Sequence, residues 1–219
     1  EFENVSAEAL EWLKEHANLP QGTELLKLSQ DRLREKAAIE AAGVPVAPYY
    51  PIHSIEDIYV SIEKLGYPSV LKTVRGGYDG KGQFVIRDES HISKASNLVE
   101  MGDCVLEAWV PFVKEISVIM TRKANGDLTH FPVAENIHQN NILHQTIVPA
   151  RITQEAEQKA VQLARNLAEE LHLVGTLAVE MFLTETDELI VNELAPRPHN
   201  SGHFTIEACE TSQFEQHVR

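Results

Sequence analysis

A segment dense in glycine and lysine lies between two short runs with the composition of β-strands, and it limits the folds open to this chain. Residues 72–83 contain four glycines and two lysines, and the strand-like runs cover 69–73 and 83–87. Glycine lets a backbone approach a phosphate closely, and lysine places positive charge beside it. Walker-type phosphate loops and dinucleotide-binding folds are disfavoured, because the segment has neither a Gly-Lys-Ser/Thr ending nor a following helix. The pattern predicts a phosphate-binding loop between paired strands, with a flexible glycine-rich hairpin as the alternative.

The remainder of the chain alternates between helical and strand patterns without an internal repeat. Helices are predicted over 6–16, 29–42, 54–66, 90–99 and 153–171. Further strands are predicted over 105–110, 115–122, 128–136, 142–148, 176–183 and 188–194. These elements predict an α+β fold with a helical lead-in over residues 1–42, a small α+β unit over 43–106 and a larger, mainly antiparallel unit over 107–219. We expect a ligand in the cleft between the two units.

The acidic composition argues against several classes of partner. The formal net charge is −14, which disfavours nucleic acid and anionic membrane surfaces, since both require a continuous basic footprint. No run approaches the ~20 apolar residues of a membrane span, and the start of the chain lacks the layout of a signal peptide. A cytoplasmic protein is therefore expected. Cys104 and Cys209 lie far apart, which favours two reduced thiols over a disulfide or zinc framework.

Carboxylates recur on the two strands of the last predicted hairpin. Glu180 lies on the first strand, and Asn192 and Glu193 lie on the second, spaced to meet across the hairpin. Facing carboxylates repel each other unless a cation lies between them, and oxygen ligands suit magnesium bound together with phosphates. Apolar residues at 178–179 and 181–182 surround Glu180 in the sequence, which favours a magnesium site over a solvated acidic edge.

A constrained loop follows this hairpin. Arg197 has a proline on each side, which restricts its backbone and suits a side chain aimed at an anion. His199 and His203 are four residues apart and could form a zinc pair. Pro198 and Gly202 interrupt a helix here, however, and no third soft ligand is near in the sequence, so an anion-binding loop is favoured.

Taken in order, these segments resemble the ATP-grasp superfamily. Within it, Gly-Gly-Tyr-Asp-Gly-Lys-Gly-Gln at 76–83 and Asn-Glu-Leu-Ala-Pro-Arg-Pro-His-Asn-Ser-Gly-His at 192–203 are similar to the N5-carboxyaminoimidazole ribonucleotide synthetases, with Glu-Ala-Trp-Val at 107–110 between them. The opening Glu-Phe-Glu-Asn is similar to the end of the N-terminal domain in that family. Because the chain also lacks an initiator methionine, we expect a fragment without its first domain and its C-terminal part.

The resemblance implies an ATP-grasp fold with the nucleotide between two subdomains, and an ATP-dependent ligase of purine biosynthesis. The implied reaction uses ATP, Mg²⁺ and bicarbonate to carboxylate aminoimidazole ribonucleotide through carboxyphosphate, and the loop at 77–83 would also exclude water as a lid. Members of the family tend to form homodimers. Biotin carboxylases and formate-dependent ribonucleotide transformylases share the nucleotide residues but not the 197–203 ending, and a nucleotide-binding module without catalysis also stays open.

The resemblance also implies roles for individual residues. The ATP phosphates would be held by Arg32, Lys72, Gly77, Tyr78, Asp79, Gly80, Lys81, Gly82 and Gln83, with Tyr78 and Asp79 also candidates to face the ribonucleotide. The adenine hinge would be Glu107, Ala108, Trp109 and Val110, the ribose would bind Glu115, and His138 would lie near the nucleotide. Glu180 and Glu193 would bind magnesium with Asn192 beside them, and Arg197, His199 and Asn200 would hold bicarbonate and the carboxylated intermediate.

Overall fold

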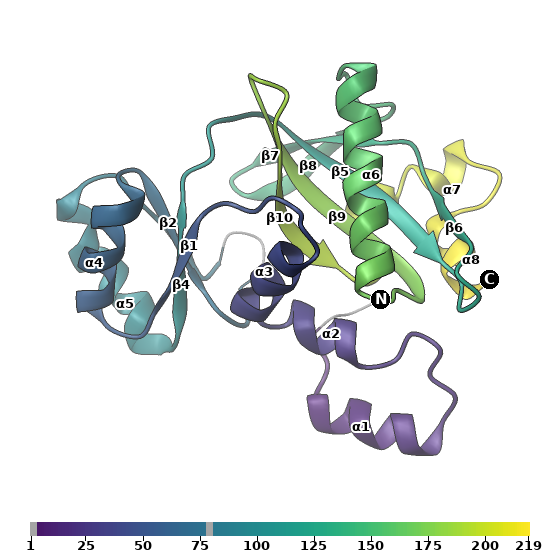
Figure 1. Cartoon of the computed structure of the whole chain (residues 1–219), viewed down its shortest axis with the longest axis horizontal. Coiled ribbons are helices and arrows are strands. Elements are labelled where there is room, and N and C mark those ends of the chain that lie inside the picture. The colour runs from purple at the N-terminus through teal and green to yellow at the C-terminus, as the bar shows by residue number, and fades with distance from the viewer. Residues whose placement is uncertain (1–3, 78–80) are drawn as a thin grey trace.

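Two antiparallel sheets organise the molecule in the computed structural model, which describes residues 4–77 and 81–219 (Figure 1). The smaller sheet has the order β1 (Tyr49–Ile52), β4 (Cys104–Ala108), β2 (Ser69–Thr73) and β3 (Gln83–Ile86). Its apolar face packs against α4 (Ile55–Leu65) and α5 (Ile92–Met101), and a 3₁₀ turn (Glu89–His91) precedes α5. Burial of this face against two helices gives the smaller sheet a core of its own.

The larger sheet runs in the order β10 (Leu189–Ala195), β9 (Gly175–Thr184), β5 (Phe112–Arg122), β7 (Ala134–Gln139) and β8 (Ile142–Ile147), and β6 (Leu128–His130) pairs with β5. Helix α6 (Gln154–Glu170) lies across it (Figure 1). Ala156, Ala160 and Ala164 recur at a spacing of four and let α6 approach the sheet closely, with Leu167 continuing the same buried face. Thr153 caps the helix by accepting from the Ala156 backbone N–H.

The N-terminal helices α1 (Ala7–His16), α2 (Glu24–Ser29) and α3 (Arg32–Ala41) precede the smaller sheet in the chain. Leu25, Ile39 and Val44 belong to the same apolar core as the larger sheet. A parallel bridge between Val46 and Val191 extends this contact. The segment predicted as a helical lead-in therefore packs on β10, and the chain ends beyond that strand in a 3₁₀ turn (Asn200–Gly202), α7 (Thr205–Ala208) and α8 (Gln213–Val218).

Several local predictions are confirmed and others need correction. Ser54 and Asp57 form the predicted capping box at the start of α4. The helix predicted over 29–42 begins only at Arg32, because the carboxylate of Asp31 accepts from the Arg34 backbone N–H and caps it there. The strand predicted over 128–136 is divided into β6 and β7. Strand β1 and the helices α2, α7 and α8 are additional, since short elements carry little periodicity.

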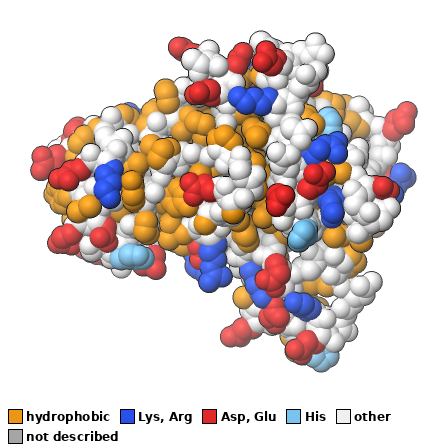
Figure 2. All heavy atoms as spheres, in the orientation of Figure 1, with side chains coloured by type: hydrophobic (Ala, Val, Ile, Leu, Met, Phe, Trp, Pro, Cys, Tyr) orange, Lys and Arg blue, Asp and Glu red, His pale blue; other side chains and the backbone are white. Residues whose placement is uncertain are grey.

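The molecular surface agrees with the acidic composition. On the face drawn in Figure 2, Lys and Arg side chains lie among Asp and Glu and form no continuous basic area. Within residues 4–77 and 81–219, no helix has both the length and the apolar character needed to cross a membrane.

Candidate active site

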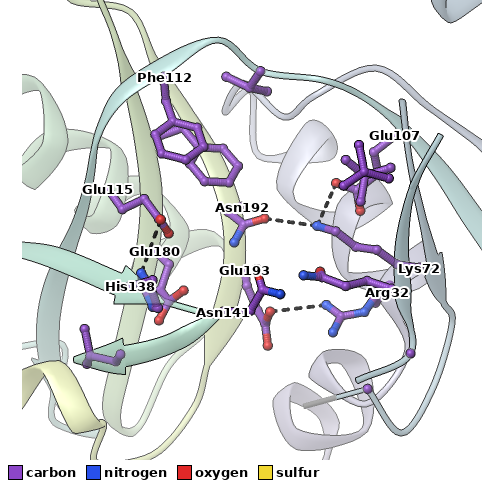
Figure 3. A pocket seen from close by; sticks show the side chains of 18 of the residues that line it. Arg32, Lys72, Glu107, Phe112, Glu115, His138, Asn141, Glu180, Asn192 and Glu193 are labelled. Atoms are coloured by element: carbon purple, nitrogen blue, oxygen red, sulfur yellow. Dashed lines mark hydrogen bonds and ion pairs between the residues drawn. The ribbon is translucent and has the colours of Figure 1, made fainter. Parts of the chain in front are cut away.

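A cavity of about 610 Å³ lies between the two sheets (Figure 3). It is of the size that commonly holds a small-molecule ligand. The predicted site residues within the described part of the chain all line it: Arg32, Lys72, Gly77, Lys81, Gly82, Gln83, Glu107, Ala108, Trp109, Val110, Glu115, His138, Glu180, Asn192, Glu193, Arg197, His199 and Asn200. Tyr78, Asp79 and Gly80 lie outside the described residues. The structure thus brings together residues that are up to 168 positions apart in the sequence.

Lys72 joins the two sides of the cavity. It lies on β2, and its Nζ donates to Glu107 Oε2 at 3.0 Å and to Asn192 Oδ1 at 3.2 Å. Glu107 belongs to the neighbouring strand β4, whereas Asn192 belongs to β10 of the larger sheet. The ammonium group is therefore fixed at the cavity wall, where it can attract an anionic ligand.

Lys36, a further cation that was not predicted from the sequence, lies behind this wall and is not among the residues that line the cavity. It projects from α3, is only 1% exposed, and places its Nζ 3.1 Å from Glu107 Oε1. Burial lowers the pKa of Lys36, although the charge of Glu107 opposes the shift. Burial acts to raise the pKa of Glu107, but Lys72 and Lys36 together outweigh it and hold that pKa below its ordinary value. One buried carboxylate thus balances two ammonium groups.

The first turn of helix α3 carries the predicted residue Arg32 and also Glu35, a second site residue that was not predicted from the sequence. The Arg32 guanidinium donates to Glu193 Oε2 at 3.2 Å. Glu35 is buried, and its carboxylate accepts from the Leu194 backbone N–H at 2.8 Å. Burial and the negative charge of Glu193 raise the pKa of Glu35 well above its ordinary value. Glu35 therefore attaches α3 to β10 next to Glu193.

The loop after β2 returns to the strand at Gly82, where a side chain would not fit. The Gly82 carbonyl accepts from the Thr73 backbone N–H at 2.8 Å. Gly82 has a φ of +75°, and a Cβ atom there would lie 2.6 Å from Thr73 Oγ1. Gly77 is also confined, because a Cβ would lie 3.0 Å from the backbone carbonyl oxygen of Lys81, and Arg32 lies just beyond at 3.4 Å. Glycine at these positions lets the backbone pass close to the cationic wall.

The opposite wall carries a carboxylate beside an imidazole. Glu115 on β5 and His138 on β7 approach to 3.2 Å between Oε1 and Nδ1. The hydrogen bond to Glu115 raises the pKa of His138, although burial opposes the shift. Phe112 stacks on Phe182 at a centroid distance of 4.5 Å and gives this end of the cavity an aromatic wall. A planar base with an attached sugar would therefore meet apolar and polar groups here.

Glu180 and Glu193 lie directly opposite each other on β9 and β10, as predicted from the hairpin. Glu180 Oε1 is 3.1 Å from His199 Nε2. Burial acts to raise the pKa of Glu180, but the hydrogen bond from His199 and the neighbouring basic side chains outweigh it, so the pKa lies below its ordinary value. Two carboxylates and the amide oxygen of Asn192 are hard donors that fit a magnesium ion carrying phosphate oxygens.

The zinc alternative finds no support in the described residues. Among them, no three His, Cys, Asp or Glu side chains are grouped so that they alone could hold a metal ion, as a zinc site would require. His199 is bound to Glu180, whereas the His203 ring lies beside Phe214 at a centroid distance of 6.1 Å. The two histidines therefore have separate environments.

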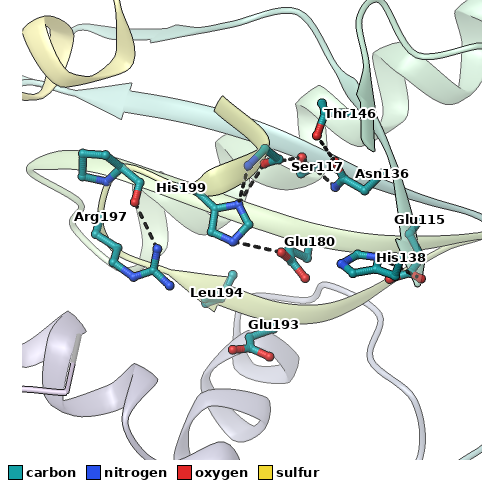
Figure 4. Close-up of polar contacts among 12 residues, drawn as sticks. Glu115, Ser117, Asn136, His138, Thr146, Glu180, Glu193, Leu194, Arg197 and His199 are labelled. Atoms are coloured by element: carbon teal, nitrogen blue, oxygen red, sulfur yellow. Dashed lines mark hydrogen bonds and ion pairs between the residues drawn. The ribbon is translucent and has the colours of Figure 1, made fainter. Parts of the chain in front are cut away.

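The loop that carries Arg197 and His199 is held by glutamines that sequence reasoning missed. Gln213 is fully buried; its Oε1 accepts from the His199 backbone N–H and its Nε2 donates to the His199 carbonyl, at 2.9 and 2.7 Å. Gln21 Nε2 donates to the Pro196 carbonyl at 2.6 Å. Arg197 donates to the Pro198 carbonyl at 3.0 Å and lines the cavity. These contacts keep the loop at the cavity edge, and Figure 4 shows Arg197 and His199, the two side chains that it carries.

Comparison with known proteins agrees with this geometry. The model of the ATP-grasp domain matches residues 37–214. An N5-carboxyaminoimidazole ribonucleotide synthase of Bacillus subtilis is 59% identical over 219 residues, which are 100% of this chain and 58% of that protein. The chain thus spans less than two thirds of the length of this relative.

Solved structures show the same relation. An N5-carboxyaminoimidazole ribonucleotide synthetase in complex with ADP has a TM-score of 0.97 and 59% identity, over 100% of this chain and 58% of that one. An Aspergillus clavatus N5-carboxyaminoimidazole synthase in complex with ADP and 5-aminoimidazole ribonucleotide has a TM-score of 0.93 and 29% identity, over 100% and 57%. Since the family model covers most of the chain and the two-sheet fold superposes closely on these structures, the chain belongs to the ATP-grasp family.

Proposed function

We propose that this chain is the nucleotide-binding part of an ATP-dependent ligase that carboxylates aminoimidazole ribonucleotide to N5-carboxyaminoimidazole ribonucleotide. The observation that carries the proposal is the cavity between the sheets, where a cationic wall faces an acidic one. The relatives named above, with ADP and 5-aminoimidazole ribonucleotide in one of their complexes, support the same assignment. Residues 43–106 and 107–219 would be its two subdomains, and we expect a cytoplasmic homodimer.

ATP would lie across the cavity. Its phosphates would bind Arg32, Lys72 and the 77–83 loop, because these groups supply positive charge and closely packed backbone. Its adenine would pair with backbone groups at 107–110. The Glu115 carboxylate would accept hydrogen bonds from the ribose hydroxyls, with His138 holding that carboxylate in place.

Magnesium would bind Glu180 and Glu193, with the amide oxygen of Asn192 beside them. When bound, the ion supplies charge neutralisation at the phosphate oxygens. Arg32 and His199 contact the two carboxylates in the structure. These contacts would keep both carboxylates aimed into the cavity while the substrates enter.

Arg197, His199 and Asn200 would hold bicarbonate beside the terminal phosphate. A bicarbonate oxygen attacks the γ-phosphorus, and ADP leaves as carboxyphosphate forms. The amine of aminoimidazole ribonucleotide then attacks the carboxyl carbon, phosphate leaves, and the nitrogen loses a proton. A guanidinium at Arg197 would stabilise negative charge as it develops in the first step, and exclusion of water would protect carboxyphosphate from hydrolysis.

Arg197→Ala in the whole protein tests this function. Magnesium-dependent ATP binding by calorimetry should stay nearly normal, whereas bicarbonate-dependent ADP release should fall on the order of 100-fold or more. A folded variant with full bicarbonate-dependent turnover would contradict the proposal. Wild-type protein that binds ATP but releases no ADP with bicarbonate and aminoimidazole ribonucleotide would instead indicate a nucleotide-binding module or a ligase for another substrate.

A further inference from the structure

A chain of polar side chains with a buried centre runs across the larger sheet beneath the candidate active site (Figure 4). Thr146 Oγ1 on β8 donates to Asn136 Oδ1 on β7 at 3.3 Å. Asn136 Nδ2 donates to Ser117 Oγ on β5 at 3.0 Å, and Ser117 Oγ donates to Ser201 Oγ at 2.8 Å. Ser117 and Ser201 are fully buried. Because water cannot reach them, each hydroxyl that accepts a hydrogen bond in this series must donate its own hydrogen bond to the next group.

The next acceptor is the imidazole of His199. Its Nδ1 lies 2.9 Å from Ser201 Oγ and 3.3 Å from the Ser201 backbone nitrogen. A backbone N–H can only donate, so Nδ1 must be the ring nitrogen without a hydrogen. The hydrogen of the neutral ring is then on Nε2, which lies 3.1 Å from Glu180 Oε1. The series of donors therefore runs in one direction from Thr146 to Glu180.

The opposite ring state would leave a buried donor without an acceptor. With a hydrogen on Nδ1, the Ser201 hydroxyl would face two donors, Ser117 Oγ and Nδ1, and its own hydrogen would have no acceptor in the series. The Ser201 backbone N–H would also point at a donor. An unsatisfied buried donor costs on the order of 1–3 kcal/mol, which favours the Nε2–H form of His199 by about 5- to 150-fold.

We infer that Asn136, Ser117 and Ser201 are positioning residues that fix His199 as the Nε2–H tautomer and thereby orient the Glu180 carboxylate. This inference rests on the proposed function insofar as Glu180 and His199 serve the ligase reaction. None of the three side chains needs to touch a substrate. They act through the ring, in the way that outer hydrogen bonds fix the tautomer of a histidine next to a metal site.

Nuclear magnetic resonance of histidine ring nitrogens tests the tautomer directly in the ¹⁵N-labelled chain without nucleotide, with His199→Gln for assignment. In the wild type, Nδ1 should be unprotonated and Nε2 protonated. Asn136→Asp keeps the shape but replaces the donor to Ser117 with an acceptor, so the series should reverse and the Nδ1–H form should increase. Ser201→Ala adds no charge and removes the hydroxyl donor, but the backbone N–H at 201 still faces Nδ1, so the Nδ1–H form should increase by a smaller amount. This variant decides the question if Asn136→Asp fails to fold.

The control is Thr121→Val, which removes a buried hydroxyl from the same strand as Ser117. Among the described residues, that hydroxyl forms a side-chain hydrogen bond with Thr176 alone. The control should leave the His199 ring state unchanged. A hydrogen on Nδ1 in the wild type, or an unchanged ring state in both test variants, would overturn the inference.

Turnover of the whole protein provides the second readout. Ser201→Ala should lower bicarbonate-dependent ADP release about 10- to 100-fold and leave the ATP dissociation constant within about twofold. If Ser201→Ala lowers stability, ATP binding and turnover equally and leaves the ring state unchanged, Ser201 has a structural role. That result would refute the inference that Ser201 positions His199. If the wild type shows no bicarbonate-dependent ADP release, the proposed function fails, whereas the ring states still decide the tautomer.

Discussion

The cluster of Lys36, Glu107 and Lys72 makes a quantitative prediction about how charge is balanced at the cavity wall. Both ammonium groups lie about 3 Å from one carboxylate, at 3.1 and 3.0 Å. At that separation each pair attracts by about 5 kcal/mol at an effective dielectric constant near 20, before the cost of desolvation is subtracted. The cluster carries two positive charges and one negative charge, so the consequence of a substitution depends on which sign it removes.

Glu107→Gln leaves two ammonium groups facing a neutral amide, and we expect the free energy of unfolding to fall by about 3–5 kcal/mol. Lys36→Met leaves Glu107 paired with Lys72, so the expected loss is smaller, about 1.5–3 kcal/mol. The double variant returns to one unpaired positive charge. Its loss should therefore be smaller than the sum of the single losses by about 1–3 kcal/mol.

Urea denaturation of the wild type, the two single variants and the double variant measures this coupling. Lys27→Met, which removes a surface lysine next to Glu11, is the control and should hardly move the midpoint. Calorimetry should also show weaker ATP binding by Lys36→Met, because Glu107 then neutralises Lys72 alone. Losses that add to within about 0.5 kcal/mol would refute the view that one carboxylate balances both lysines.

Three further predictions follow from the site and its surroundings. Hydrogen bonds from Arg151 and Lys114 lower the pKa of Glu135 to about 2. The contribution of Glu135 to the free energy of unfolding should therefore be complete above about pH 4.5 and be lost as the pH falls toward 2. Glu135→Gln should abolish this pH dependence in urea titrations across that range. Glu115→Ala should weaken ATP binding by about 1.5–3 kcal/mol in calorimetry without changing the bicarbonate dependence of turnover; unchanged affinity would refute its role at the ribose. Glu193→Gln should weaken magnesium-dependent ATP use far more than it lowers the melting temperature, and full activity at equal stability would contradict metal binding.

The parts of the fold that could be predicted from the sequence depend on contacts between neighbours in the chain. The capping box at Ser54 is such a contact, because both partners lie within one helical turn. The hairpin that places Glu180 opposite Glu193 was also predictable, since the spacing and the turn lie in one short segment. By contrast, the side chains of Ser117 and Ser201 meet only because β5 and the loop after β10 come together. Nothing in their local sequence distinguishes them from exposed serines.

Helix α3 shows why the buried charges of the site were missed. Its charged residues 32, 35 and 36 look like a solvated helical face, and only the packing of α3 against β10 and β4 turns that face inward. Once Arg32 is directed at Glu193, its neighbours one turn later must also enter the protein interior. Each buried side chain then requires a polar partner. Glu35 accepts a hydrogen bond from a backbone N–H of β10, and Lys36 forms an ion pair with Glu107. The same geometry that brings a phosphate-binding cation to the cavity therefore requires the buried ion pair behind it, and makes α3 an integral part of the site.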